Sequence, residues 1–130
     1  MEDSAFSQEF LGFIRAAIPS VSAAELLLLL FRQPERWWTL HDLLRELPAD
    51  ASISETDAGG CVETLRACRL VEFDEEKRIR YRAASDALEA QVRTLAQAYE
   101  ERPVTLIRMI YALRDSTIRS FADAFKFRKR

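Results

Sequence analysis

Residues 54–82, SETDAGGCVETLRACRLVEFDEEKRIRYR, change from a helical to a strand-like spacing of apolar side chains. Ser54 and Asp57 form a capping box, in which both side chains satisfy backbone amides at the start of a helix. After this helix, apolar and polar residues alternate with a period of two on either side of the polar turn 74–77, which predicts a β-hairpin. The helix itself has its apolar positions three and four residues apart, at Ala58, Cys61, Val62, Leu65 and Cys68.

The pairing of the hairpin follows from keeping its apolar side chains on one face. This condition places Phe73 opposite Ile79 and Val71 opposite Tyr81, with residues 75–77 as a three-residue loop. The same register predicts two cross-strand ion pairs and leaves two basic side chains without a partner. The pairs are Asp74 with Arg78 and Glu72 with Arg80, and the unpaired cations are Lys77 and Arg82.

The sequence before residue 54 predicts three more helices. Residues 6–18 have apolar side chains at a period of 3.6, which is typical of a helix with one buried face. Ser22 with Glu25, and Thr39 with Asp42, form two further capping boxes, each at the start of a leucine-containing helix.

Trp37 and Trp38 separate the second and third helices as a short, bulky extended piece. We interpret them as core residues and as a first strand of the small sheet, with the lining of a ligand pocket as the alternative. Helices are predicted again after the hairpin, one of them opened by Pro103 and a last one beginning at Asp115. The predicted fold is mainly α with a small β-hairpin, organised as an N-terminal helix, a central domain and C-terminal helices: 1–19, 20–84 and 85–130.

Composition and charge place further bounds on the chain. Its 130 residues are 48% hydrophobic and 31% charged, which is typical of one globular domain. The longest apolar run, 23–31, is interrupted by Glu25 and is far shorter than the roughly 20 residues that cross a bilayer. The acidic start and the two cysteines, roughly 10 Å apart on one helix, favour a cytoplasmic protein with reduced thiols. The net charge of −2 is uneven, because residues 102–130 carry eight basic and two acidic side chains.

The order of helix, short strand, helix, helix and hairpin over residues 20–84 is that of a winged helix-turn-helix. The segments Ser54–Asp57 and Leu65–Phe73 resemble the recognition helix and wing entry of winged-helix bacterial regulators of the MarR and PadR groups. The resemblance implies a helix in the DNA major groove, a wing on the backbone or minor groove, and terminal helices that form a dimer. These families usually have glycine with a positive φ before the Leu-Val pair. Arg69 stands there in this chain, so the turn is open to a different conformation.

We expect three groups of DNA contacts: the resemblance implies those of the helix and the hairpin, and the concentrated positive charge at the C-terminus suggests the third. The outward face of helix 54–68 has small side chains and is slightly acidic, whereas base edges are usually contacted by Arg, Lys, Asn or Gln. An equally supported interpretation is that this face is a docking surface for a protein. For the hairpin arginines, an equally supported interpretation is that they pair with acids of the same hairpin. The alternative for the basic C-terminus is a solvent-exposed helix end whose positive charge complements the helix dipole. The expected DNA-binding residues are Thr56, Thr64 and Arg66 on the helix, Lys77, Arg78, Arg80 and Arg82 on the hairpin, and Lys126, Arg128, Lys129 and Arg130 at the C-terminus.

The C-terminal helices predict a symmetric homodimer. Leucine, valine and tyrosine recur at a 4-3-4 spacing after residue 85, and residues 104–113 are apolar on more than one side. The predicted interface consists of Leu88, Val92, Leu95, Tyr99, Ile107 and Ile110.

Catalysis has little support in the sequence. His41 is the single histidine, and two cysteines seven residues apart with one histidine do not make a zinc site. Gly59 and Gly60 lack the lysine and strand of a phosphate-binding loop. We therefore expect no enzyme, metal, cofactor or membrane partner. The expected function is a homodimeric DNA-binding transcriptional regulator, and the alternative is a winged-helix protein-interaction module that does not bind DNA.

Overall fold

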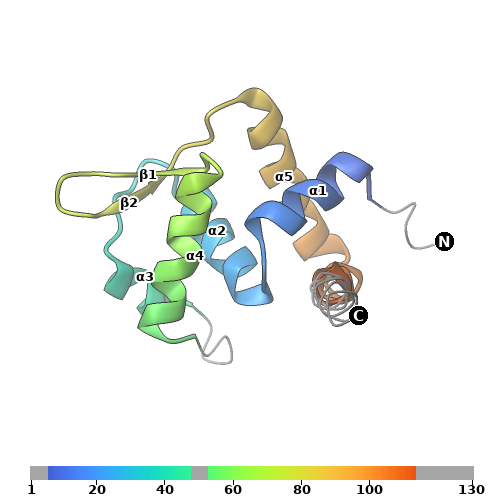
Figure 1. Cartoon of the computed structure of the whole chain (residues 1–130), viewed down its shortest axis with the longest axis horizontal. Coiled ribbons are helices and arrows are strands. Elements are labelled where there is room, and N and C mark those ends of the chain that lie inside the picture. Colours follow the sequence, from blue (N-terminus) through green and yellow to red (C-terminus); the bar gives the residue numbers. More distant parts are fainter. Residues whose placement is uncertain (1–5, 48–52, 114–130) are drawn as a thin grey trace, which may run out of the picture.

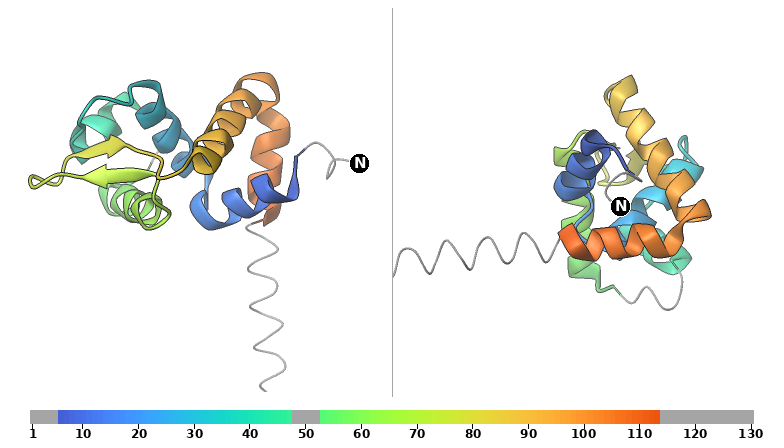
Figure 2. Two further views of the ribbon diagram at one scale, coloured as in Figure 1. Left: turned by 90° about the horizontal axis from the view of Figure 1, so that it is seen from above. Right: turned by 90° about the vertical axis from the view of Figure 1, so that its right-hand side faces the viewer.

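The computed structural model describes residues 6–47 and 53–113, which form two groups of elements side by side (Figures 1 and 2). One group holds the antiparallel hairpin and three helices, and the other holds the remaining helices. The first group is α2 (Val21–Arg32), α3 (Leu40–Glu46), α4 (Glu55–Ala67), β1 (Val71–Phe73) and β2 (Ile79–Tyr81). The second is α1 (Gln8–Ala17), α5 (Asp86–Glu101) and a helix at Pro103–Leu113. The structure is thus mainly helical with one small sheet, as predicted.

Side-chain caps fix where the helices begin. The hydroxyls of Thr39 and Ser54 each accept a hydrogen bond of 3.0 Å from the amide three residues on, which confirms these two predicted caps. The predicted cap at Ser22 is wrong, because Ser20 accepts from the Ala23 amide at 3.2 Å and α2 begins two residues earlier. Glu25, the other half of the predicted box, instead accepts a hydrogen bond of 2.7 Å from the Tyr99 hydroxyl of α5.

The hairpin has the predicted register. Val71 pairs with Tyr81, and Phe73 pairs with Ile79. Trp38 extends this sheet by a third short segment, since its amide donates to the Ile79 carbonyl at 2.8 Å and its carbonyl accepts from the Ile79 amide at 2.7 Å. The indole of Trp38 is fully buried. Its placement confirms the interpretation as a core residue that also begins the sheet.

The turn from α4 into β1 keeps a positive φ although it has no glycine. Arg69 has a φ of 64°, in the left-handed region that costs an L-residue on the order of 1 kcal/mol. Two backbone hydrogen bonds hold it there, from the Leu70 amide to the Leu65 carbonyl at 3.0 Å and from the Ala84 amide to the Arg69 carbonyl at 3.0 Å. The turn expected of the resemblance is therefore present, with arginine in the position that favours glycine.

We predict that Arg69→Gly raises the free energy of unfolding by about 1 kcal/mol, because glycine adopts a positive φ without a steric penalty. The midpoint of urea denaturation measures this change. Arg66→Gly is the matched control, since Arg66 lies within α4 and glycine there should lower stability by about the same amount. A shift of the midpoint in the same direction for both variants would contradict the assignment of strain to residue 69.

One hydrophobic core runs through both groups of elements. Val92 and Leu95 of α5 have no exposed surface, and Ile110 is 2% exposed. These three side chains are core residues of a single chain, which corrects their prediction as a dimer interface. Leu88, Tyr99 and Ile107 are partly buried. The 4-3-4 spacing of α5 thus faces α1 and α2 of the same chain.

Candidate nucleic-acid interface

The outward face of α4 offers few groups that could read bases. Thr56 is exposed. Thr64 is half-buried, and its hydroxyl donates to the Gly60 carbonyl at 3.0 Å within the helix. Arg66 lies 3.6 Å from the Glu63 carboxylate, and its guanidinium covers the ring of Phe73 at 4.9 Å. The predicted contacts on α4 are therefore one threonine hydroxyl and one arginine that already has local partners.

Two of the predicted wing arginines are held by acids of the same hairpin. Arg78 Nε donates to Asp74 Oδ2 at 2.7 Å, and its Nη2 lies 3.3 Å from Glu76. Arg80 Nε donates to Glu72 at 3.0 Å, and its guanidinium stacks over the ring of Trp37 at 4.5 Å. The sequence left open whether these hairpin arginines pair with acids of the hairpin. They do, because both predicted cross-strand ion pairs are present.

The electrostatics of Asp74 agree with this pairing. Desolvation, the largest single effect, acts to raise the pKa of Asp74, but hydrogen bonds from the amide and guanidinium of Arg78 and from the Glu76 amide together lower it. The carboxylate is charged at neutral pH and fixes the loop that follows β1. Lys77, in this loop, also has a φ of 64° and is exposed.

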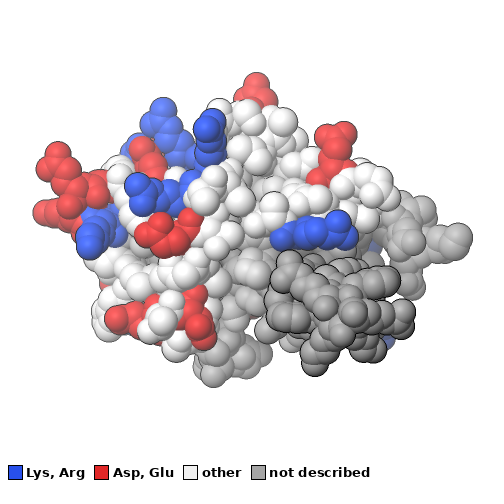
Figure 3. All heavy atoms as spheres, in the orientation of Figure 1, with Lys and Arg blue, Asp and Glu red and all other residues white. Residues whose placement is uncertain are grey.

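Three arginines gather where α4 ends and the hairpin begins, and we call Arg66, Arg69 and Arg82 the basic cluster. Backbone hydrogen bonds join their segments, from the Arg69 amide to the Arg66 carbonyl at 2.9 Å and from the Arg82 amide to the Leu70 carbonyl at 2.9 Å. The side chains of Arg66 and Arg82 are 57% and 68% exposed, and Arg69 is exposed as well. Figure 3 shows basic side chains over this end of α4 and the hairpin.

Arg82 is the arginine of this cluster for which the predicted hairpin register gives no cross-strand partner. Its Nη1 lies 3.7 Å from Glu72, which Arg80 already occupies at shorter distance. Arg69 was not among the predicted contacts, because the helical pattern extended through it placed its side chain toward the core. The outward orientation could have been inferred from the glycine that the similar families usually have at this position. A positive φ there ends the helix and turns the side chain of Arg69 outward.

Acidic side chains occupy the opposite end of α4 and the tip of the hairpin. Glu55 and Asp57 lie in the first turn of α4, Asp42 lies in that of α3, and Glu75 and Glu76 lie at the tip. In Figure 3 one acidic area lies at the left, at the tip of the hairpin, and the other lies below the basic side chains, at the start of α4. Carboxylates at a helix start compensate its positive dipole, so the start of α4 is a poor site for phosphate.

Groups that could perform catalysis are sparse in the described residues. His41 is exposed on α3. Burial raises the pKa of both Cys61 and Cys68, with the charge of Asp57 adding to the effect at Cys61, so both are thiols at neutral pH. Within residues 6–47 and 53–113, no three His, Cys, Asp or Glu side chains lie close enough to hold a metal ion. The predicted contacts Lys126, Arg128, Lys129 and Arg130 lie outside the described residues.

Comparisons of this chain with protein-family models, with curated proteins and with solved structures return no match. Among the described helices, none is by itself long and apolar enough to span a membrane. Only α1 and α2 together reach that length, and they are bent by 99° where they meet.

Proposed function

We propose that this chain is a winged-helix protein that binds duplex DNA, and that its basic cluster contacts the phosphate backbone. The observation that carries the proposal is the position of Arg66, Arg69 and Arg82, which are exposed and anchored by backbone hydrogen bonds at the junction of α4 and the hairpin. Exposed arginines on a rigid support are the usual donors to phosphate oxygens. The order of α2, α3, α4 and hairpin supports the same function by its likeness to winged helices.

The structure supports contacts at the base of the wing better than at its tip. Arg78 and Arg80 donate to carboxylates at 2.7 and 3.0 Å, closer than the 3.6 and 3.7 Å between the guanidinium groups of Arg66 and Arg82 and their nearest acids. The tip itself carries Glu75 and Glu76. Binding through backbone phosphates without many base contacts is weakly specific and strongly dependent on salt.

We expect Arg82→Ala to weaken binding to every duplex and to reduce the salt slope by about one unit, because one phosphate contact is lost. Fluorescence anisotropy with a labelled random duplex, from about 50 to about 200 mM salt, measures both quantities. Arg80→Ala should have a smaller effect, since Arg80 already pairs with Glu72.

Arg93→Ala is the matched control for this measurement. Arg93 is equally exposed on α5, where it pairs with Glu89 at 3.2 Å outside the basic cluster. Its removal should leave affinity and salt slope unchanged. Failure of the unmodified protein to bind any duplex at about 50 mM salt would overturn the proposal, as would equal losses for Arg82→Ala and Arg93→Ala.

The alternative is a docking face for another protein on the outward side of α4. The observation that favours it is the small surface around Gly60, where a Cβ would meet no atom within 4 Å, beside the exposed Glu63. A protein that docks here would be blocked by Gly60→Arg, whereas phosphate binding at the basic cluster would be kept or improved by the added charge.

A further inference from the structure

One carboxylate is shared by two arginines on the outer face of the hairpin. Arg80 Nε donates to Glu72 Oε2 at 3.0 Å, and Arg82 Nη1 lies 3.7 Å from the same oxygen. Glu72 is the direct cross-strand partner of Arg80. Arg82 continues the ladder beyond β2, because its amide donates to the Leu70 carbonyl at 2.9 Å. Since residues two apart on a strand point to the same side, the three charged side chains share one face of the sheet.

Arg80 has a second support that does not depend on Glu72. Its guanidinium stacks over the ring of Trp37 at 4.5 Å, and Trp37 is itself half-buried. A guanidinium stacked on an aromatic ring still presents its N–H groups in its own plane to an acceptor. Without the charge of Glu72, the ring of Trp37 would therefore still hold Arg80 beside Arg82.

Glu72 is well placed to oppose a phosphate group at this end of the hairpin. Its side chain is 31% exposed, so its charge is screened less than that of a fully exposed carboxylate. A phosphate oxygen that accepts from Arg82 would approach a second negative charge close to the same guanidinium. Apart from this carboxylate, Arg80 and Arg82 are two cations on one face, which is an arrangement suited to phosphate.

We propose that Glu72 restrains phosphate binding at the basic cluster, because it occupies Arg80 and repels the phosphate that Arg82 would bind. The inference rests on the proposed function and concerns how strongly the same site binds. It makes Arg80 a phosphate-binding side chain that the hairpin itself holds back. Glu72 is thus a residue that sets affinity without a contact to DNA.

Replacing Glu72 by glutamine tests the restraint. Glu72→Gln should tighten binding of a labelled random duplex on the order of 10-fold at about 50 mM salt and increase the salt slope by about one unit, because Arg80 adds one phosphate contact. Fluorescence anisotropy measures both quantities. Glutamine keeps the size of the side chain and an acceptor oxygen for Arg80, so the hairpin should remain folded, which the midpoint of urea denaturation checks.

Arg80→Ala in both backgrounds shows whether the gain comes from the released arginine. In the unmodified protein it should have a small effect, since Glu72 already occupies Arg80. In the Glu72→Gln background it should cancel most of the gain in affinity and the added unit of slope. This non-additivity is the coupling that a double-mutant cycle measures, and a merely structural role of Glu72 would not produce it.

Glu100→Gln is the matched control, because Glu100 is exposed on α5 and its replacement changes the net charge equally. It should leave affinity and salt slope nearly unchanged. Equal gains for Glu72→Gln and Glu100→Gln, or additive effects of Glu72→Gln and Arg80→Ala, would overturn the inference, while binding by the unmodified protein would keep the proposed function. Binding by Glu72→Gln alone would support the restraint and overturn DNA binding by the unmodified chain. No binding by any of these proteins would overturn both.

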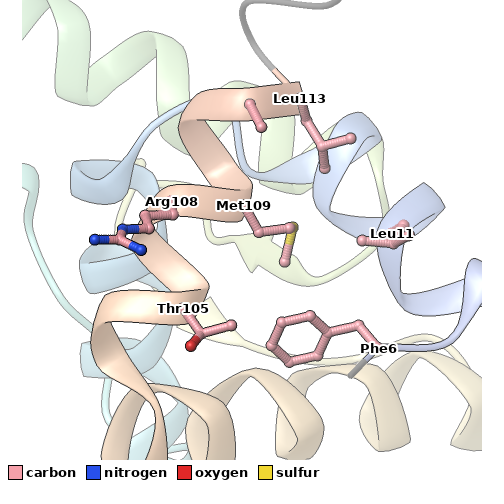
Figure 4. A pocket seen from close by; sticks show the side chains of 7 residues that line it. Phe6, Leu11, Thr105, Arg108, Met109 and Leu113 are labelled. Carbon is pink, nitrogen blue, oxygen red and sulfur yellow. The ribbon is translucent and has the colours of Figure 1, made fainter. Parts of the chain in front are cut away.

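A separate hollow of this chain lies away from the charged face of the hairpin. Met109 and Leu113 face Phe6 and Leu11 across a groove between the helix Pro103–Leu113 and the region of α1 (Figure 4). No residue that lines this groove takes part in the restraint by Glu72, so none of the variants above alters it.

Discussion

Replacing Trp38 by alanine is expected to lower the free energy of unfolding by about 3–5 kcal/mol. The indole is fully buried, the Trp38 backbone pairs with Ile79 of the hairpin, and the guanidinium of Arg36 covers the ring at 3.6 Å. The substitution would leave a cavity between the helices and the sheet. Since a domain of this size has a total stability of about 5–15 kcal/mol, a large part of it depends on this one side chain.

Trp38→Phe separates the volume of this side chain from its polar atom. Trp38 Nε1 is buried and donates to no acceptor among the described residues, a loss that typically costs about 1–3 kcal/mol. Phenylalanine fills most of the space and removes the unsatisfied donor, so its cost should be about 1 kcal/mol or less. Urea denaturation followed by circular dichroism compares the two variants. Equal losses would show that the cavity is not the cause.

Features that depend on neighbouring residues could be predicted from the sequence. The hairpin register follows from the alternation of apolar side chains, and with it the pairing of Arg80 with Glu72. The caps Thr39 and Ser54 follow from the hydroxyl and carboxylate three residues apart. In these cases the physical cause lies within a few residues or across one turn.

Features that depend on distant residues could not be predicted. Ser22 with Glu25 matches a capping box, but Glu25 accepts its hydrogen bond from Tyr99, 74 residues away. The spacing of Val92 and Leu95 suits a coiled coil and a buried face equally well, and only packing against the other helices decides between them. The outward orientation of Arg69 likewise depends on its hydrogen bond with Ala84 beyond the hairpin.

Reversing two charges of the basic cluster, by Arg69→Glu/Arg82→Glu, is expected to weaken binding of a random duplex on the order of 100-fold at about 50 mM salt. Each phosphate contact contributes about 0.9 to the slope of the logarithm of affinity against the logarithm of salt concentration. Two contacts therefore account for about a 100-fold change in affinity between about 1 M and about 50 mM salt. The salt slope should fall by about two units in the same titration.

Arg15→Glu/Arg93→Glu changes the net charge equally but away from the cluster, on α1 and α5, where both arginines are exposed. It should reduce affinity far less, because a contact with phosphate acts at short range and the distant field is screened over about 10 Å at 0.1 M salt. Arg69→Gly completes the comparison: it removes one charge and relieves the positive φ, so it should weaken binding while it stabilises the fold. If both double variants bound equally weakly, the loss of binding would follow net charge alone. The basic cluster would then not be the site of contact, and the outward face of α4 would be the surface to test.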